Sequence, residues 1–220
     1  MKRLLLVFGA AWLLVVPKAS AWEGQVTVST PNTSMVLHAN EGEDLRMDYY
    51  GTSLLNVTQL KEAGSDLNFA ALPTFGTIDM IHLPALQVQH TDGDLNLELK
   101  VEGYELKEEA NAKVHIFTMK DQLKPVTVKV FYKAYNKVDI IETWTEISHN
   151  EKGSIILKRF DSGHLTIRRG DVWLTHLHGD WCAEAQVTQE PLTPGLQVIR
   201  NTDGARNAHC DAPEIMLSLD

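Results

Sequence analysis

Hydrophobic residues recur at every second position along several stretches of this chain. The alternation covers 95–101, where apolar and polar residues take turns, and 126–135, where valines dominate one side. A third stretch, 139–148, is rich in β-branched residues around Trp144. Because successive side chains of a strand point to opposite faces, this period of two predicts half-buried β-strands.

Short turn signals separate the predicted strands. They contain Gly, Asn or Asp, as in Asp92-Gly93, Asn136-Lys137, Glu151-Lys152-Gly153, Arg169-Gly170-Asp171 and Asp203-Gly204. Many strands at short spacing favour two packed antiparallel sheets, a β-sandwich, over a parallel α/β sheet. Since no repeat or low-complexity linker interrupts the pattern, the sequence predicts one all-β domain.

Two segments depart from the alternation. Thr58 can cap one short helical turn over 59–63, with Gly64 as its stop. The segment 67–84 lacks periodicity and contains Pro73, Gly76 and Pro84. We therefore expect it to form a long connection across the surface.

The N-terminus has the layout of a secretory signal peptide. Lys2 and Arg3 precede an apolar run over 4–16, and Ala19-Ser20-Ala21 offers a small-residue cleavage site. The alternative is a membrane anchor, but the run is shorter than the ~20 residues of a spanning helix. We expect a signal peptide at 1–21, a mature domain over 22–220, and a secreted or periplasmic protein without membrane contact after cleavage.

The mature chain is strongly acidic. Cleavage removes three of the 20 Lys and Arg residues and none of the 29 Asp and Glu residues, which leaves a formal charge of about −12. Such a surface repels nucleic-acid backbones and anionic lipids, so neutral or cationic ligands are expected. Two cysteines, Cys182 and Cys210, can form a disulfide in an oxidising compartment or stay reduced, and the sequence leaves both alternatives open.

Nearly every type of metal-ligating residue occurs in the segment HLHGDWCAEAQ, residues 176–186. Taken as one strand, its first face carries His176, His178, Asp180, Cys182, Glu184 and Gln186. Same-face neighbours lie ~6.6–7 Å apart in a strand, whereas metal–ligand bonds measure only ~2.0–2.3 Å. Two histidines can bind one metal ion together, but all six residues of this face cannot. A polar strand facing solvent or an interface is therefore favoured over a metal site, and no motif implies a cofactor.

The opposite face of the same segment holds Trp181 beside Gly179. A bare backbone next to an indole leaves an apolar shelf that suits the C–H face of a sugar ring. The alternative is that Trp181 is an ordinary core residue. The residues alone favour neither.

Six segments add a resemblance. They are, in chain order, YYGTSL, PALQVQHTDGDLNLELKVEGYE, VFYKAYNKVDIIETWTEISHNEKGSI, WLTHLHGDWCAEAQ, LTPGLQVI and GARNAHCDAPEIMLSLD. In this order and with these gaps, they resemble the N-terminal domain of secreted bacterial α-galactosidases of glycoside hydrolase family 36. No single segment decides the resemblance, but their collinearity covers nearly the whole mature chain.

The resemblance implies a fold and an activity. The fold would be an antiparallel β-supersandwich, normally followed by a (β/α)8 catalytic barrel and a small C-terminal β domain. The activity would be retaining hydrolysis of terminal α-galactosyl residues in oligosaccharides such as melibiose and raffinose. Both catalytic Asp residues of the family belong to the barrel, so this chain alone is expected to be inactive. The full-length enzyme would form a homo-oligomer, a tetramer.

The resemblance also implies two galactose-contacting positions. Glu41, before Gly42 and upstream of the Tyr50-Gly51 turn, stands where the family more often has Asp. Trp181 matches the Trp of the family's Gly-x-Trp motif. Thr52 and Ser53 replace an Arg that some members carry, and Arg206 matches a Gly-x-Arg motif with a structural or interface role. The alternatives are a free-standing carbohydrate-binding module and a zinc site at His176 and His178.

Overall fold

The computed structural model describes residues 23–54, 68–76, 83–167, 170–201 and 210–219. All regular structure within these ranges is β, in antiparallel pairs, which confirms the predicted fold class. The signal peptide, the helical turn at 59–63 and Arg206 lie outside the described residues. The chain divides into two compact units, Met1–Thr166 and Ile167–Asp220, so the expectation of one domain over 22–220 stays a prediction.

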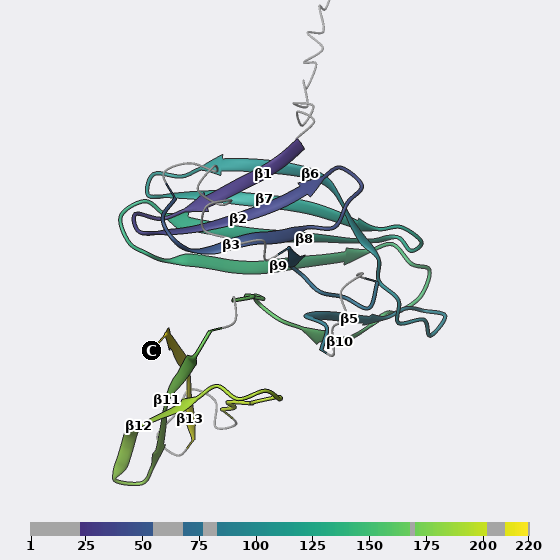
Figure 1. Cartoon of the computed structure of the whole chain (residues 1–220). Coiled ribbons are helices and arrows are strands. Elements are labelled where there is room, and N and C mark those ends of the chain that lie inside the picture. Colours follow the sequence, from purple (N-terminus) through teal and green to yellow (C-terminus); the bar gives the residue numbers. More distant parts are fainter. Residues whose placement is uncertain (1–22, 55–67, 77–82, 168–169, 202–209, 220) are drawn as a thin grey trace, which may run out of the picture. The chain divides into compact units, whose positions relative to one another are not determined.

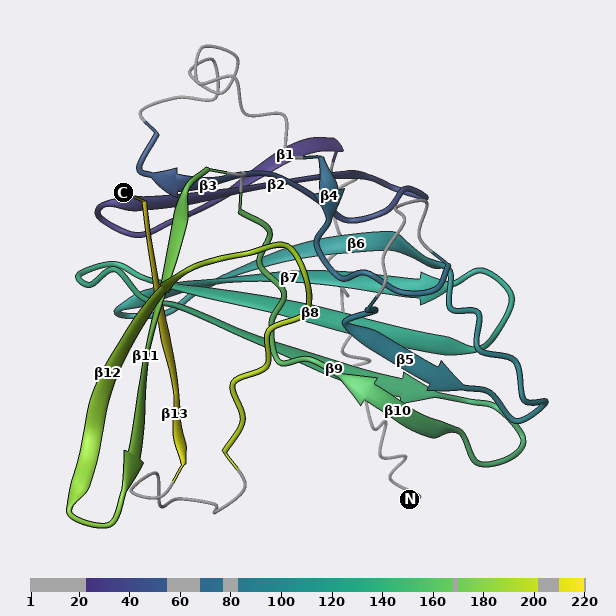
Figure 2. The ribbon, with the colours of Figure 1, turned by 60° about the horizontal axis from the view of Figure 1, so that its bottom comes forward.

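Two four-stranded antiparallel sheets form the sandwich of the first unit. One sheet has the strand order β1 (Glu23–Ser29), β2 (Thr33–Asn40), β3 (Arg46–Thr52) and β4 (Phe69–Ala70). The other runs β6 (Leu99–Glu108), β7 (Ala112–Asp121), β8 (Val126–Tyr135) and β9 (Ile141–His149). Figures 1 and 2 show β1–β3 as one layer against β6–β9. A two-stranded ribbon of β5 (Leu86–Gln89) and β10 (Ile156–Phe160) completes the unit.

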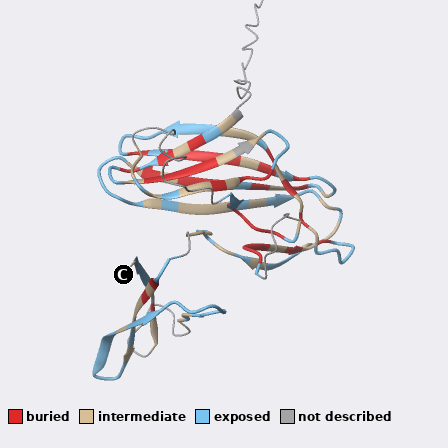
Figure 3. Ribbon diagram, viewed as in Figure 1, coloured by how far each residue is buried: buried red, intermediate tan, exposed pale blue. Residues whose placement is uncertain are grey.

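The main core lies between these two sheets. The alternation predicted for β8 is confirmed, because its inward side chains are all buried: Val126, Val128, Val130, Tyr132 and Ala134. Figure 3 shows the buried residues concentrated on the facing strands. The other face of β8 holds Phe131, whose ring stacks on Trp144 of β9 at 4.7 Å. This stack, with Val114 and Ile116, forms a second small cluster and explains why that face mixes apolar and polar residues.

The described residues of the segment 67–84, which are 68–76 and 83–84, differ from the surface connection that the sequence predicts. Residues 70–74 are buried, and β4 pairs with β3. The carbonyl of Pro73 accepts hydrogen bonds from the backbone of Ala85 (2.8 Å) and Leu86 (3.3 Å). The hydroxyl of Thr74 donates to the carbonyl of Leu97. Burial is possible without periodicity because these long-range bonds satisfy the backbone polar groups.

The second unit is a three-stranded antiparallel sheet. Its order is β12 (Ala183–Pro191), β11 (Val172–Asp180) and β13 (Asp211–Leu219). Only Val172, Leu174 and Ala212 are buried among its described hydrophobic residues, while Val187, Ile215 and Met216 are more than half exposed. No helix in the described ranges combines the length and the apolar content that a membrane crossing requires.

Candidate functional site

The segment 176–186 forms a hairpin, and the single strand expected for it is wrong. Strand β11 ends at Asp180, Trp181 and Cys182 make the turn, and β12 begins at Ala183. The Asp180 carboxylate accepts a hydrogen bond from the backbone of Trp181 (2.7 Å), and Cys182 adopts a φ of 58°. Asp favours such turns because its side chain bonds to neighbouring backbone. The row of six residues is therefore divided between two antiparallel strands and their turn.

Trp181 lies in the turn of this hairpin with 78% of its surface exposed. The alternative that it is a core residue of this chain is therefore wrong. Figure 1 shows the β11–β12 hairpin from which the turn projects. An indole at this place offers a flat apolar face, and the hydrogen-bonded strands on both sides fix its position.

The two candidate zinc ligands do not converge with a third. The rings of His176 and His178 are 6.2 Å apart, and His178 Nδ1 lies 3.2 Å from the Thr188 hydroxyl. His176 Nδ1 is 3.6 Å from the Asp211 carboxylate, beyond hydrogen-bond reach. The part of the chain that the structure describes holds no group of three His, Cys, Asp or Glu side chains fit to bind a metal ion. No disulfide joins Cys182 to Cys210.

Glu41 lies in the turn between β2 and β3, with its side chain exposed. The turn is fixed by hydrogen bonds from Gly42 N to the carbonyl of Val101 (2.8 Å) and from Glu43 N to the carbonyl of Asn40 (3.0 Å). Gly42 has a φ of 84°, which disfavours any side chain there. The backbone therefore holds the Glu41 carboxylate toward solvent.

The structure also locates two further features of the site that the sequence predicts. Tyr50-Gly51, expected as a turn, lies within β3, where Gly51 pairs with Ser34. Glu41 belongs to the first compact unit and Trp181 to the second. Each residue is therefore described within its own unit.

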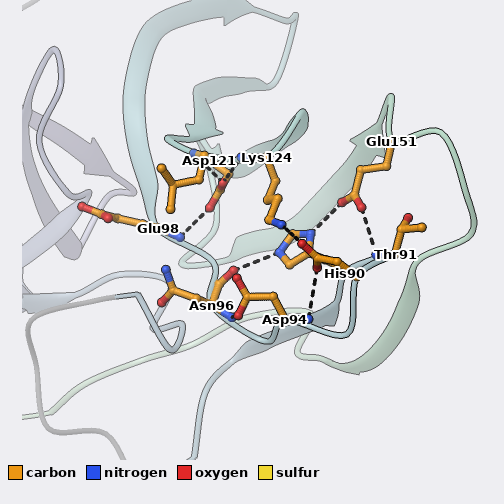
Figure 4. Close-up of polar contacts among 10 residues, drawn as sticks. His90, Thr91, Asp94, Asn96, Glu98, Asp121, Lys124 and Glu151 are labelled. Atoms are coloured by element: carbon orange, nitrogen blue, oxygen red, sulfur yellow. Dashed lines mark hydrogen bonds and ion pairs between the residues drawn. The ribbon is translucent and has the colours of Figure 1, made fainter.

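A group of titratable side chains surrounds His90, which the sequence did not single out (Figure 4). His90 Nδ1 lies 2.6 Å from the Glu151 carboxylate, and Nε2 lies 2.9 Å from the carbonyl of Asn96. The His90 side chain is fully buried. Glu151 also accepts a hydrogen bond from Thr91 N at 3.0 Å. These bonds, that from His90 first, lower the pKa of Glu151 to about 2.

The same region contains a second carboxylate that binds backbone. Asp121 accepts hydrogen bonds from the amides of Glu98 (2.6 Å), Leu123 (2.9 Å) and Lys124 (2.5 Å), and the Lys124 ammonium pairs with Asp92. Every polar group in these contacts already has a partner inside the fold. The cluster therefore fixes the loops around 90–98, 121–124 and 151. Sequence patterns could not reveal it, because its members lie up to 61 positions apart.

Comparison with known proteins identifies the family. The family described as "Glycosyl hydrolase family 36 N-terminal domain" matches residues 43–219. A comparison with curated protein sequences finds no match. Among solved structures, a variant of the α-galactosidase AgaA from Geobacillus stearothermophilus in complex with raffinose aligns with a TM-score of 0.77 and 21% identity, over 89% of this chain and 32% of that one.

A second solved structure gives the same result. The α-galactosidase from Lactobacillus brevis aligns with a TM-score of 0.75 and 20% identity, over 88% of this chain and 30% of that one. The chain thus spans about a third of the length of these enzymes, and at such identities the likeness shows a shared fold. Since the family match covers most of the sequence, the chain belongs to the glycosyl hydrolase family 36 N-terminal domains.

Proposed function

We propose that this chain is the non-catalytic N-terminal domain of a secreted or periplasmic α-galactosidase. The enzyme hydrolyses terminal α-galactosyl residues of oligosaccharides such as melibiose and raffinose. The observation that carries the proposal is the family match over 43–219. Solved relatives with this fold are α-galactosidases, crystallised in complexes with raffinose and with stachyose.

The carboxylates of the chain support a non-catalytic role. Retaining glycosidases need two carboxyl groups about 5–5.5 Å apart, one of them an acid whose pKa is raised. Among the described residues, each carboxylate with a resolved shift has a lowered pKa: Asp92, Asp139 and Glu151. Each is held ionised by hydrogen bonds within the fold, which suits structure rather than proton donation to a leaving group.

The β11–β12 hairpin is the part of the domain that we assign to the rim of the galactose pocket. Trp181 would stack on the sugar, since its indole is exposed at a rigid turn. Glu41, held outward by its own turn, would contact a sugar hydroxyl in its own or a neighbouring subunit. The exposed Val187, Ile215 and Met216 would be covered by the catalytic barrel or by another subunit of a tetramer.

The assay that tests this proposal uses a nitrophenyl α-galactoside and the purified chain. The chain alone is expected to release no nitrophenol above the buffer blank, because the family's catalytic Asp pair belongs to the barrel. If the chain still released nitrophenol after further purification, the proposal would be wrong.

A free-standing carbohydrate-binding module is the second candidate, favoured by the exposure of Trp181 without any other domain. This candidate requires calorimetric binding of galactose or raffinose by the chain alone and its loss in Trp181→Ala. The domain proposal requires that Trp181 contribute measurably to sugar binding only within the longer enzyme.

A further inference from the structure

A cavity of about 480 Å³ opens in the first unit between the two sheets of the sandwich. One wall is the edge strand β1, with Gln25, Thr27 and Ser29. The other is formed by β6 and β7, with Tyr104, Lys113 and His115. Its volume falls in the range of about 300–1,000 Å³ that is typical of small-molecule sites. It shares no residue with the Trp181 hairpin or the Glu41 turn.

His115 is the most buried of the polar residues that line this cavity. Only 5% of the residue is exposed. Its Nδ1 lies 2.9 Å from the Tyr104 hydroxyl, while Nε2 makes no hydrogen bond to any residue that the structure describes. Burial, together with the nearby Lys113, lowers the pKa of His115 to about 4, so the ring is neutral at pH 7. A neutral imidazole with one nitrogen engaged presents the other to the cavity as a single donor or acceptor.

The remaining lining is almost entirely uncharged. Two amides (Gln25, Asn136) and two hydroxyls (Thr27, Ser29) line it together with Val26 and Leu106. Gln25 Nε2 donates to the Asp48 carboxylate (2.8 Å), and the Ser29 hydroxyl lies 3.3 Å from that of Ser34, which leaves the Gln25 carbonyl oxygen and the Thr27 hydroxyl to face a ligand. Lys113 is the one charged side chain among the lining residues, and it is exposed. Amides and hydroxyls can donate to and accept from hydroxyl groups, whereas an anion would require several cations.

From this lining we infer that the cavity is a binding site for a neutral, hydroxyl-rich molecule of mono- or disaccharide size. The hydroxyls of the ligand would meet the polar residues of β1 and the His115 ring. Its C–H surface would lie against Leu106 and Tyr104. The inference rests on the cavity alone and holds whether or not the chain belongs to a galactosidase.

An NMR titration of the ¹⁵N-labelled full chain with melibiose tests this site. Saturating shifts are expected at amides of β1 and of 104–115, with a dissociation constant of about 1 mM. The indole signal of Trp181 should not follow the same curve. Leu106→Trp and Asn136→Trp each place an indole at the mouth of the cavity and should weaken binding at least about tenfold. Both residues are partly or fully exposed, so either variant can fold.

Two further variants make the test selective. Leu123→Trp, at a more exposed leucine outside the cavity, should bind as the unaltered chain does. Lys113→Met should change the affinity for melibiose less than about twofold, because the ligand is neutral. The site would be overturned if the amides of β1 and of 104–115 showed no saturable shift. It would also be overturned if Leu106→Trp and Asn136→Trp both bound melibiose as tightly as the unaltered chain. Tighter binding of inorganic phosphate or galacturonate, lost in Lys113→Met, would overturn the ligand class.

The titration also separates this inference from the proposed function. Loss of cavity binding would leave the galactosidase proposal intact, since that proposal depends on Trp181 and on the family match. Binding that shifts only the Trp181 indole would support the module and count against the cavity.

Discussion

His90 shows how two hydrogen-bond acceptors can fix the position of one side chain. Its ring nitrogens face the Glu151 carboxylate and the carbonyl of Asn96, neither of which can donate. The two contacts hold the buried ring in place between a loop carbonyl and the Glu151 carboxylate. Removing one partner of such a contact leaves the other buried polar group without its hydrogen bond, which costs more than the contact itself contributes.

A stability measurement on Glu151→Gln should reveal how much the contact between His90 and Glu151 contributes. The free energy of unfolding in urea at pH 7 should fall by about 2 kcal/mol, the scale of a hydrogen bond to a charged group. The folded pKa of Glu151 is about 2, below its ordinary 4.5, so the carboxylate stabilises the fold fully above pH 4.5. That stabilisation is lost as the pH falls through 2.

The pH dependence supplies the control for this prediction. The unaltered chain should lose more stability between pH 4.5 and 2 than Glu151→Gln does. Glu105→Gln, at an exposed carboxylate, should keep the unaltered slope. Equal slopes in the unaltered chain and in Glu151→Gln would show that the pair does not contribute.

At the residue scale, the sequence could name candidates only where the chemistry is local. Trp181 could be named as a candidate from the sequence. Its exposure depends on the turn after Asp180, which the alternating pattern of residues did not indicate. His90 and His115 could not be named, since each acquires its role from residues brought near by the fold. His115 approaches Tyr104 only because β6 pairs with β7.

At the scale of elements, the turns at one end of the sandwich are joined by Asp139. It follows β8 and accepts hydrogen bonds from the Thr30 hydroxyl (2.7 Å), Asn32 N (2.7 Å) and Asn32 Nδ2 (2.6 Å) in the β1–β2 turn. These bonds hold its pKa below the ordinary value. One carboxylate thus ties a turn of the first sheet to a turn of the second.

Asp139→Ala should lower the melting temperature of the chain, because three donors of the β1–β2 turn lose their acceptor. Asp139→Asn should lower it less, since the amide oxygen still accepts. Lys137→Ala, in the same turn, is the matched control and should be neutral. Calorimetry that finds Asp139→Ala as stable as the control would contradict the link.

The clearest strands could be predicted because one face of each is buried. That condition holds for β8, where every second residue enters the core. It fails for β12, whose side chains are mostly exposed, and for 175–180 of β11, where no side chain is buried, so alternation there carried no information about where the chain reverses. The buried residues 71–74, which follow β4, lack any period because they bond to distant segments rather than along a neighbouring strand, as Ala71 N does to the carbonyl of Leu45 (2.9 Å).

At the scale of the whole molecule, this chain has about a third of the length of the enzymes that share its fold. Its first unit has a complete core, whereas the second exposes apolar side chains on a three-stranded sheet. Exposed apolar surface of this kind is usual where a further domain or subunit docks. The exposed surface of the second unit is therefore where we propose that a catalytic barrel or another subunit docks.

The most direct test of this account is a kinetic comparison in the protein produced from the complete reading frame. Initial rates of raffinose hydrolysis would be measured for the unaltered protein and for Trp181→Ala, with Trp144→Phe in the sandwich as the matched control. We predict α-galactosidase activity, a KM raised about tenfold by Trp181→Ala with a smaller effect on kcat, and an unaltered KM in the control. A protein without α-galactosidase activity, or a KM that Trp181→Ala leaves unchanged, would contradict the account.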